Sequence, residues 1–246
     1  MIRQSLGAGI GRIGRFRHVP ETRLGVWFLG TRTWKDHVLK VALGDLCRLI
    51  ERRQPHYHTV LDVGCGHGQS FRLLRRAFRP VRLIGVDIDP QVLKRARRRA
   101  ASAGARATVI QGDCTNLPLE DATVDLVFCH QTFHHLVDQA GALREFRRVL
   151  RPGGLLLFAE STRVYIESWI IRLLFRHPRD VQRSAAEYLA MLRAEGFFVR
   201  PDAISYPYLW WSRPDLGAAE WMLKIAPPPP GQREETLLNV VAVKQD

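Results

Sequence analysis

Five short apolar runs recur along the chain, and each is followed by glycine or by polar residues. They lie near 59–64, 82–87, 106–111, 123–129 and 154–160. Between them, apolar residues recur at helical spacing near 68–79, 90–103 and 138–150. This alternation predicts buried parallel strands joined by helices, and therefore an open, doubly wound α/β sheet.

Further elements are expected on both sides of this repeat. An amphipathic helix is predicted over Thr33–Arg53, and two more strands near 197–206 and 236–244. One side of the helix collects its apolar residues: Trp34, Val38, Val41, Leu46, Leu49 and Ile50.

The segment VLDVGCGHG, Val60 to Gly68, closes the first apolar run with an acid and three alternating glycines. Glycines there allow positive φ and let a ligand approach the backbone, while the following helix directs unpaired N–H groups toward the loop. Asp62 offers a carboxylate to a ligand amine. A carboxylate there would face the pyrophosphate of a dinucleotide, so the loop favours a different ligand.

Polar residues also end the next three runs. Asp87 follows Gly68 by 19 residues, a spacing typical of a carboxylate that binds ribose hydroxyls. The third run reaches Gly112 and Asp113, and the fourth ends in the segment CHQT. Because the carboxyl ends of parallel strands meet at one edge of a sheet, these residues predict a single ligand site at a topological switch point.

These segments together resemble the class I S-adenosylmethionine-dependent methyltransferases, and in particular the small-molecule (type 11) group that includes the quinone-biosynthesis C-methyltransferases. The matching stretches span about Thr59 to Ser161, in the order VLDVGCGHG, LIGVDIDP, QGDCTNLP, DLVFCHQTFHHL and EFRRVLRPGGLLLFAE. The resemblance implies a Rossmann-like, mostly parallel sheet of seven strands whose last strand is antiparallel.

The resemblance also implies S-adenosylmethionine as cofactor and a role for each matching residue. The methionine part would be held by Asp62 and the loop that contains Gly64, Cys65, Gly66 and Gly68. Asp87 would bind the ribose, Ile88 would pack on the adenine, and Asp113 with Cys114 would meet the adenine amine. His130 and Gln131 would line the sulfonium end.

Methyl transfer requires mainly an aligned nucleophile, with a general base for a hydroxyl or carbon acceptor. His134 is the first candidate base, because it follows the fourth strand, and His130 is the second. A purely structural role for the segment His134–Leu136 is an equally weighted alternative.

Two insertions, at about 162–183 and 206–235, are expected to select the acceptor within a single domain over 33–246. Both are rich in aromatic residues, and arginines border them, which favours a lipophilic or aromatic small molecule. A helix in the first insertion, with aromatic residues on one face and arginines around it, could also lie on an anionic membrane surface. The more common arrangement of such an amphipathic helix is to pack its apolar face against the domain. Residues 1–32 are interpreted as a basic arm that is flexible, disordered or ordered as a lid.

The net charge of +13 is high. A solvated basic surface is favoured over nucleic-acid binding, and an RNA methyltransferase is kept as an alternative. Against that alternative, the residues after the fourth strand read CHQT, whereas nucleic-acid methyltransferases that modify an exocyclic amine carry an Asn-Pro-Pro-aromatic motif there. A nucleotide-cofactor oxidoreductase is the other alternative, and the glycine spacing GxGxG in place of GxGxxG disfavours it.

The remaining patterns concern compartment and metals. The four cysteines show no closely spaced pair, which favours a reduced, cytoplasmic protein. Peripheral contact with the inner face of the membrane is kept as an additional expectation. There is no secretory pattern and no run of about 18 apolar residues. No metal is expected, because adjacent His134 and His135 should not face one ion easily. The pattern predicts no oligomeric state.

Overall fold

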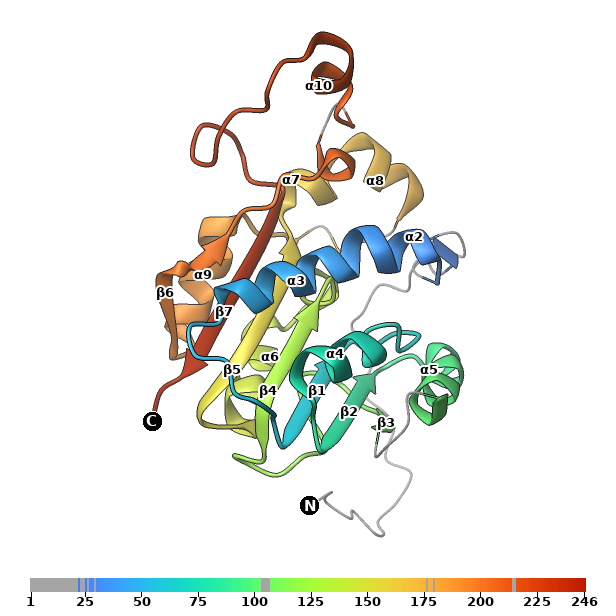
Figure 1. Ribbon diagram of the computed structural model, residues 1–246, viewed down its shortest axis with the longest axis vertical. Helices are drawn as coiled ribbons and strands as arrows, with labels where there is room; N and C mark the ends of the chain where they lie inside the picture. The colour runs from blue at the N-terminus through green and yellow to red at the C-terminus, as the bar shows by residue number, and fades with distance from the viewer. Residues whose placement is uncertain are drawn as a thin grey trace.

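The computed structural model describes residues 22, 25, 27, 28, 30–102, 107–175, 177, 178, 180–213 and 216–246. Within these residues, seven strands form one sheet in the order β3-β2-β1-β4-β5-β7-β6 (Figure 1). The strands are β1 (Thr59–Val63), β2 (Arg82–Asp87), β3 (Ala107–Gln111), β4 (Val124–His130), β5 (Leu150–Ser161), β6 (Phe197–Ser205) and β7 (Leu237–Lys244). Strands β1 to β5 pair in parallel, and β7 is antiparallel to both β5 and β6. The predicted fold class is confirmed.

Helices cover both faces of the sheet and create two apolar cores. The first face carries α3 (Lys40–Leu49), α4 (Phe71–Phe78) and α5 (Pro90–Ser102). The second carries α6 (Gln139–Val149) and α9 (Ala185–Ala194). Successive residues of a strand point to opposite faces, so central strands such as β1 and β4, whose residues are all buried, read as continuous apolar runs, whereas β3 at the edge of the sheet is only partly buried.

The helix predicted over Thr33–Arg53 is continuous but irregular. It consists of α2 (Arg32–Trp34), a π-helical turn η1 (Lys35–Leu39) and α3, and it crosses the sheet as one blue rod in Figure 1. Leu46 is fully buried, as expected, whereas Val41 is exposed, so its assignment to the apolar side is wrong. The π turn shifts the helical register, which changes the face on which later residues lie.

Helix α9 was not among the predicted elements, although its signal is present. Ser184 accepts from the backbone N–H of Glu187, and the Glu187 carboxylate accepts from the N–H of Ser184. This reciprocal capping box satisfies two otherwise unpaired donors and fixes the start of the helix. The pattern S-x-x-E before an apolar segment would have located it.

The two insertions lie beyond the carboxyl ends of the central strands. The first forms α7 (Arg163–Ile166) and α8 (Trp169–Leu174), and the second forms η3 (Trp210–Ser212) and α10 (Ala218–Leu223). Figure 1 shows α7 and α8 next to the α2 end of the long helix, with α10 farther out. Tyr165 and Trp211 join the insertions through an edge-on contact with ring centroids 5.6 Å apart.

Most of the predicted basic arm, residues 1–21, lies outside the described residues. Within the described part of the chain, no helix has the length and apolar character needed to cross a bilayer.

Candidate active site

The glycine loop after β1 adopts left-handed backbone at all three glycines, with φ of +66° at Gly64, +49° at Gly66 and +72° at Gly68. A Cβ on Gly64 would overlap the side chain of Thr132 at 2.2 Å, whereas a Cβ on Gly66 would meet nothing within 4 Å. Gly64 is therefore required for packing against the end of β4. Gly66 leaves open space beside the backbone, as a closely approaching ligand requires.

Asp62 supplies a buried carboxylate to this loop. It is 3% exposed and accepts a hydrogen bond from the Ser70 hydroxyl at the start of α4. Burial raises the pKa of Asp62 to about 7, the Ser70 hydrogen bond opposes the shift, and the charge of Asp87 adds to it. A carboxylate in this state is stabilised by a cationic ligand group.

Asp87 ties the end of β2 to the glycine loop. Its carboxylate accepts from the N–H of Gly66 at 2.8 Å and from the N–H of Asp89 at 3.0 Å. Burial raises the pKa of Asp87, and these two backbone hydrogen bonds oppose the rise.

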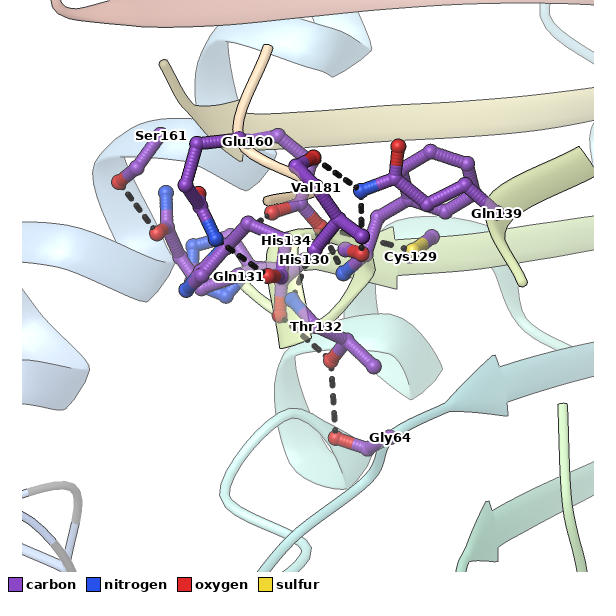
Figure 2. Close-up of polar contacts among 12 residues, drawn as sticks. Gly64, Cys129, His130, Gln131, Thr132, His134, Gln139, Glu160, Ser161 and Val181 are labelled. Carbon is purple, nitrogen blue, oxygen red and sulfur yellow. Dashed lines mark hydrogen bonds and ion pairs between the residues drawn. The ribbon is translucent and has the colours of Figure 1, made fainter. Parts of the chain in front are cut away.

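His130 and Gln131 form the opposite wall, at the end of β4. The His130 ring stacks on Phe128 with centroids 5.8 Å apart and meets Trp34 edge-on, also at 5.8 Å. Its buried Nε2 atom has no hydrogen-bond partner within the described residues, and burial lowers the pKa of His130 to about 4. Gln131 adopts a φ of 51° and its Oε1 accepts from the Ser161 hydroxyl at 2.6 Å (Figure 2).

These two walls enclose a polar cavity of about 110 Å³. It is lined by six of the residues expected to bind the cofactor: Asp62, Gly64, Cys65, Gly66, His130 and Gln131. Asp87, Gly68, Ile88, Asp113 and Cys114 are not among the described lining residues. Asp113 caps its own turn through Thr115, and Cys114 is buried.

A second, apolar cavity of about 360 Å³ lies beside the polar one. Aromatic residues dominate its wall: Trp27, Phe28, Trp34, Tyr165, Trp169, Phe175, Trp210 and Trp211. They come from residues 27–34 and from both insertions. Trp34 lines both cavities, so the two spaces are neighbours that share this residue in their walls.

His134 lies outside the described walls of both cavities. It is 3% exposed, its Nδ1 lies 2.7 Å from Oε2 of Glu160, and it is not among the described residues that line either cavity (Figure 2). Only His130 of the two candidate bases faces the polar cavity.

The two adjacent histidines lie closer together than the sequence pattern led us to expect. His134 and His135 share the 3-10 turn η2 (Phe133–His135), and their ring centroids lie 4.3 Å apart. The tight turn brings neighbouring side chains together in a way that a strand or an α-helix would not.

Four residues of the site were missed in the sequence. Ser70 and Thr132 contact the glycine loop, Trp34 joins the cavities, and Glu160 organises the turn after β4. Glu160 could have been noticed as an acid inside an apolar run. The other three depend on contacts between distant segments.

An acid-bearing glycine loop at the switch point of a parallel sheet defines the class of Rossmann-like α/β proteins that bind a nucleotide-containing cofactor. Residues 61–158 match the family described as "Methyltransferase domain". This stretch is therefore similar to a methyltransferase domain, in line with the resemblance of its motifs to the class I S-adenosylmethionine-dependent enzymes.

Several curated relatives with sequence similarity to this chain are also methyltransferases by name. A fatty-acid O-methyltransferase of Mycolicibacterium smegmatis is 38% identical over 111 residues, which are 45% of this chain and 40% of the relative. A malonyl-[acyl-carrier protein] O-methyltransferase of Halorhodospira halophila is 38% identical over 115 residues, 46% of this chain and 39% of the relative. The chain spans no more than about half the length of the curated relatives it matches.

The fold is also found in solved structures. A chain in the complex of the Haloferax volcanii Trm112 methyltransferase activator with a methyltransferase superposes with a TM-score of 0.66 at 22% identity. The match covers 90% of this chain and 93% of the other, so it includes the flanking elements outside residues 61–158.

Proposed function

We propose that this protein binds S-adenosylmethionine in the polar cavity and methylates a small apolar molecule held in the apolar cavity. The observation that carries the proposal is that Trp34 lines both cavities, which places the two spaces next to each other. When bound, S-adenosylmethionine supplies an electrophilic methyl group on a positively charged sulfur. The chain has to align the acceptor with that methyl group within about 3–3.5 Å and keep water out.

The residues of the polar cavity suit the methionine half of this cofactor. Asp62 is a buried carboxylate that a ligand ammonium would stabilise, and Gly66 leaves space beside its backbone. The loop Gly64–Gly68, with Cys65, would surround the methionine part, and Gln131 would lie with His130 at the sulfonium end.

The nucleoside half is assigned to the neighbouring strand ends. Asp87 would bind the ribose hydroxyls, Ile88 would pack on the adenine, and Asp113 with Cys114 would meet the adenine amine. These residues lie outside the polar cavity, so the proposal requires this side of the site to open when the cofactor binds.

The apolar cavity indicates the class of acceptor. Its volume is within the range of small-molecule sites, and its wall is mainly aromatic, with Arg213 as a charged lining residue. Thr33, His37 and Ser168 supply a few polar groups for orientation. The relatives named for fatty-acid and malonyl-carrier substrates make a lipophilic acceptor with a polar head the reasonable first class to test.

We assign contact with the acceptor's reacting group to His130 in preference to His134. His130 is held by Phe128 and Trp34, and its buried Nε2 has no partner among the described residues, so the proposal requires the acceptor hydroxyl to reach this atom from the apolar cavity when the site opens. Because burial lowers its pKa to about 4, the ring is neutral at pH 7, and in the tautomer that leaves Nε2 unprotonated it would accept a hydrogen bond from that hydroxyl.

Exposed apolar side chains near the apolar cavity support contact with a membrane surface. Trp169 and Leu173 of α8 are 71% and 74% exposed, and Trp221 of α10 is 76% exposed. Aromatic residues with neighbouring arginine are suited to the interface of an anionic bilayer. A lipophilic acceptor would then pass from the bilayer into the apolar cavity.

Calorimetric titration of the purified chain with S-adenosylmethionine, NADH and total transfer RNA tests the proposal. We expect stoichiometric binding of the first alone, followed by transfer of a deuterated methyl group to a lipid-extract component detected by mass spectrometry. Preferential binding of NADH would favour an oxidoreductase, and methylated RNA would favour the RNA enzyme.

A further inference from the structure

Three histidines lie next to one another outside the described walls of the two cavities. His134 and His135 belong to η2, and His177 comes from the segment that follows α8. Their ring centroids are separated by 4.3 Å, 5.1 Å and 4.8 Å, and one nitrogen from each ring lies within 4.8 Å of the other two. His134 is buried, whereas His135 and His177 are half-buried, so the cluster is accessible from solvent.

Glu160 fixes the orientation of His134. One carboxylate oxygen accepts from the N–H groups of Thr132 and Phe133, each at 2.8 Å, and the other lies 2.7 Å from His134 Nδ1 (Figure 2). A carboxylate saturated by donors in this way is an acceptor, so Nδ1 carries the proton. The Nε2 atom of a neutral His134 then presents a lone pair.

Two buried glutamines hold the segment containing His177 against the turn. Gln182 Nε2 donates to the carbonyl oxygens of His134 and Pro178, at 3.0 Å and 2.6 Å. Gln139 Nε2 donates to the carbonyl oxygens of Phe133 and Val181, at 3.3 Å and 3.0 Å. The two glutamine side chains therefore connect segments more than 40 residues apart in sequence.

We propose that His134, His135 and His177 form a three-histidine site for a divalent transition-metal ion, best represented by Zn²⁺. Three neutral imidazoles are a common zinc ligand set, and a buried carboxylate behind one of them sets its tautomer and orientation. Nitrogen ligands of tetrahedral zinc lie about 3.3 Å apart, so rotation of the two half-buried rings would close the site. The fourth position is left to water or an exogenous ligand.

The position of the site suggests what a bound ion would do. His177 is two residues from Phe175, which lines the apolar cavity, and His134 is two residues from Thr132, which lines the polar one. An ion shared by these segments would fasten the first insertion to the end of β4. It would thereby stabilise the wall of the apolar cavity, whatever reaction occurs there.

Binding of Zn²⁺ to the chelator-treated full chain, measured by competition with a chromophoric chelator, tests this site. We expect one equivalent per chain and a rise in melting temperature on addition of the ion. His177→Ala and His135→Ala should each weaken binding by about tenfold or more, and His56→Ala, at an exposed histidine outside the cluster, should not. Co²⁺ should give the visible absorption of a four-coordinate site, lost in His177→Ala.

A conservative variant separates ligand orientation from folding. Glu160→Gln keeps the shape of the side chain but offers an amide N–H to Nδ1, which moves the His134 proton to Nε2. We expect a 10- to 100-fold loss of Zn²⁺ affinity in a folded protein. The proposal is overturned if the wild type binds less than one equivalent, or if the His177 and His135 variants bind as tightly as His56→Ala.

Discussion

The Nδ1 atom of His134 lies 2.7 Å from Oε2 of Glu160, and both side chains are buried. The same carboxylate accepts backbone N–H groups of Thr132 and Phe133, so one side chain satisfies the donors of the turn after β4. This pair connects the end of β5 with the wall of the polar cavity.

The first prediction concerns the stability that this pair provides. Glu160→Leu leaves the two N–H groups and His134 without an acceptor and should lower the free energy of unfolding by about 3 kcal/mol or more. Glu160→Gln retains an acceptor oxygen and an amide partner for His134, so it should lower the free energy of unfolding by only about 1 kcal/mol. Urea denaturation gives both values, with Glu167→Gln at an exposed position as control. Equal stability of the Leu and Gln variants would contradict the assigned role of Glu160.

The second prediction concerns the pH dependence of cofactor binding. The raised pKa of Asp62, about 7, means that the carboxylate takes up a proton as the pH falls through 7. A ligand ammonium binds the ionised form, so S-adenosylmethionine affinity should fall by up to about tenfold per pH unit below 7 and level off above it. Asp62→Asn should bind more weakly and lose this dependence. Calorimetry in matched buffers measures the affinity at each pH. If the affinity of Asp62→Asn depends on pH as steeply as that of the wild type, another group is responsible for the titration.

The third prediction concerns His130. His130→Phe preserves the stacking on Phe128 and the edge contact with Trp34 but removes the ring nitrogens. We expect kcat for the identified acceptor to fall by about 10²-fold or more, while the Kd for S-adenosylmethionine changes less than about threefold. A kcat near that of the wild type would remove His130 from contact with the reacting group.

The fourth prediction concerns the membrane surface. Vesicles rich in phosphatidylglycerol should float the wild-type protein at low salt, and pure phosphatidylcholine vesicles should float it less. Trp169→Glu combined with Leu173→Glu should release it, since both side chains are exposed on α8. Phe198→Glu, at an exposed apolar residue on β6, is the matched control. If the wild type does not float, the membrane contact is wrong and the apolar-cavity acceptor still stands.

The positions of the central strands follow from the sequence because strands such as β1 and β4 are apolar runs buried on both sides, whereas the order of the strands in the sheet was not predicted. The glycine loop is equally local, since Gly64, Gly66 and Gly68 reveal a left-handed backbone before any contact is known. The identity of the cofactor was inferred from the resemblance of these motifs to the methyltransferase family and not from the residues alone.

The contacts between segments could not be predicted in this way. Trp34 joins the two cavities through a helix with a π turn, and His177 reaches His134 because two glutamines hold its segment in place. Neither relationship has a fixed spacing in the sequence. The same holds for His134, whose place after the fourth strand predicted a base, although its ring turns to Glu160.

Calorimetric binding of S-adenosylmethionine to a matched pair of glycine variants tests the central claim most directly. Gly66 and Gly153 both have positive φ, and a Cβ would meet nothing within 4 Å at either position, but only Gly66 lines the polar cavity. Valine at either position therefore introduces similar backbone strain, which thermal unfolding of both variants would verify. We expect stoichiometric binding by the wild type and by Gly153→Val, and a loss of at least about 100-fold in Gly66→Val, because its side chain would fill the ligand space. Equal affinities of the two variants, or no binding by the wild type, would contradict the proposed site.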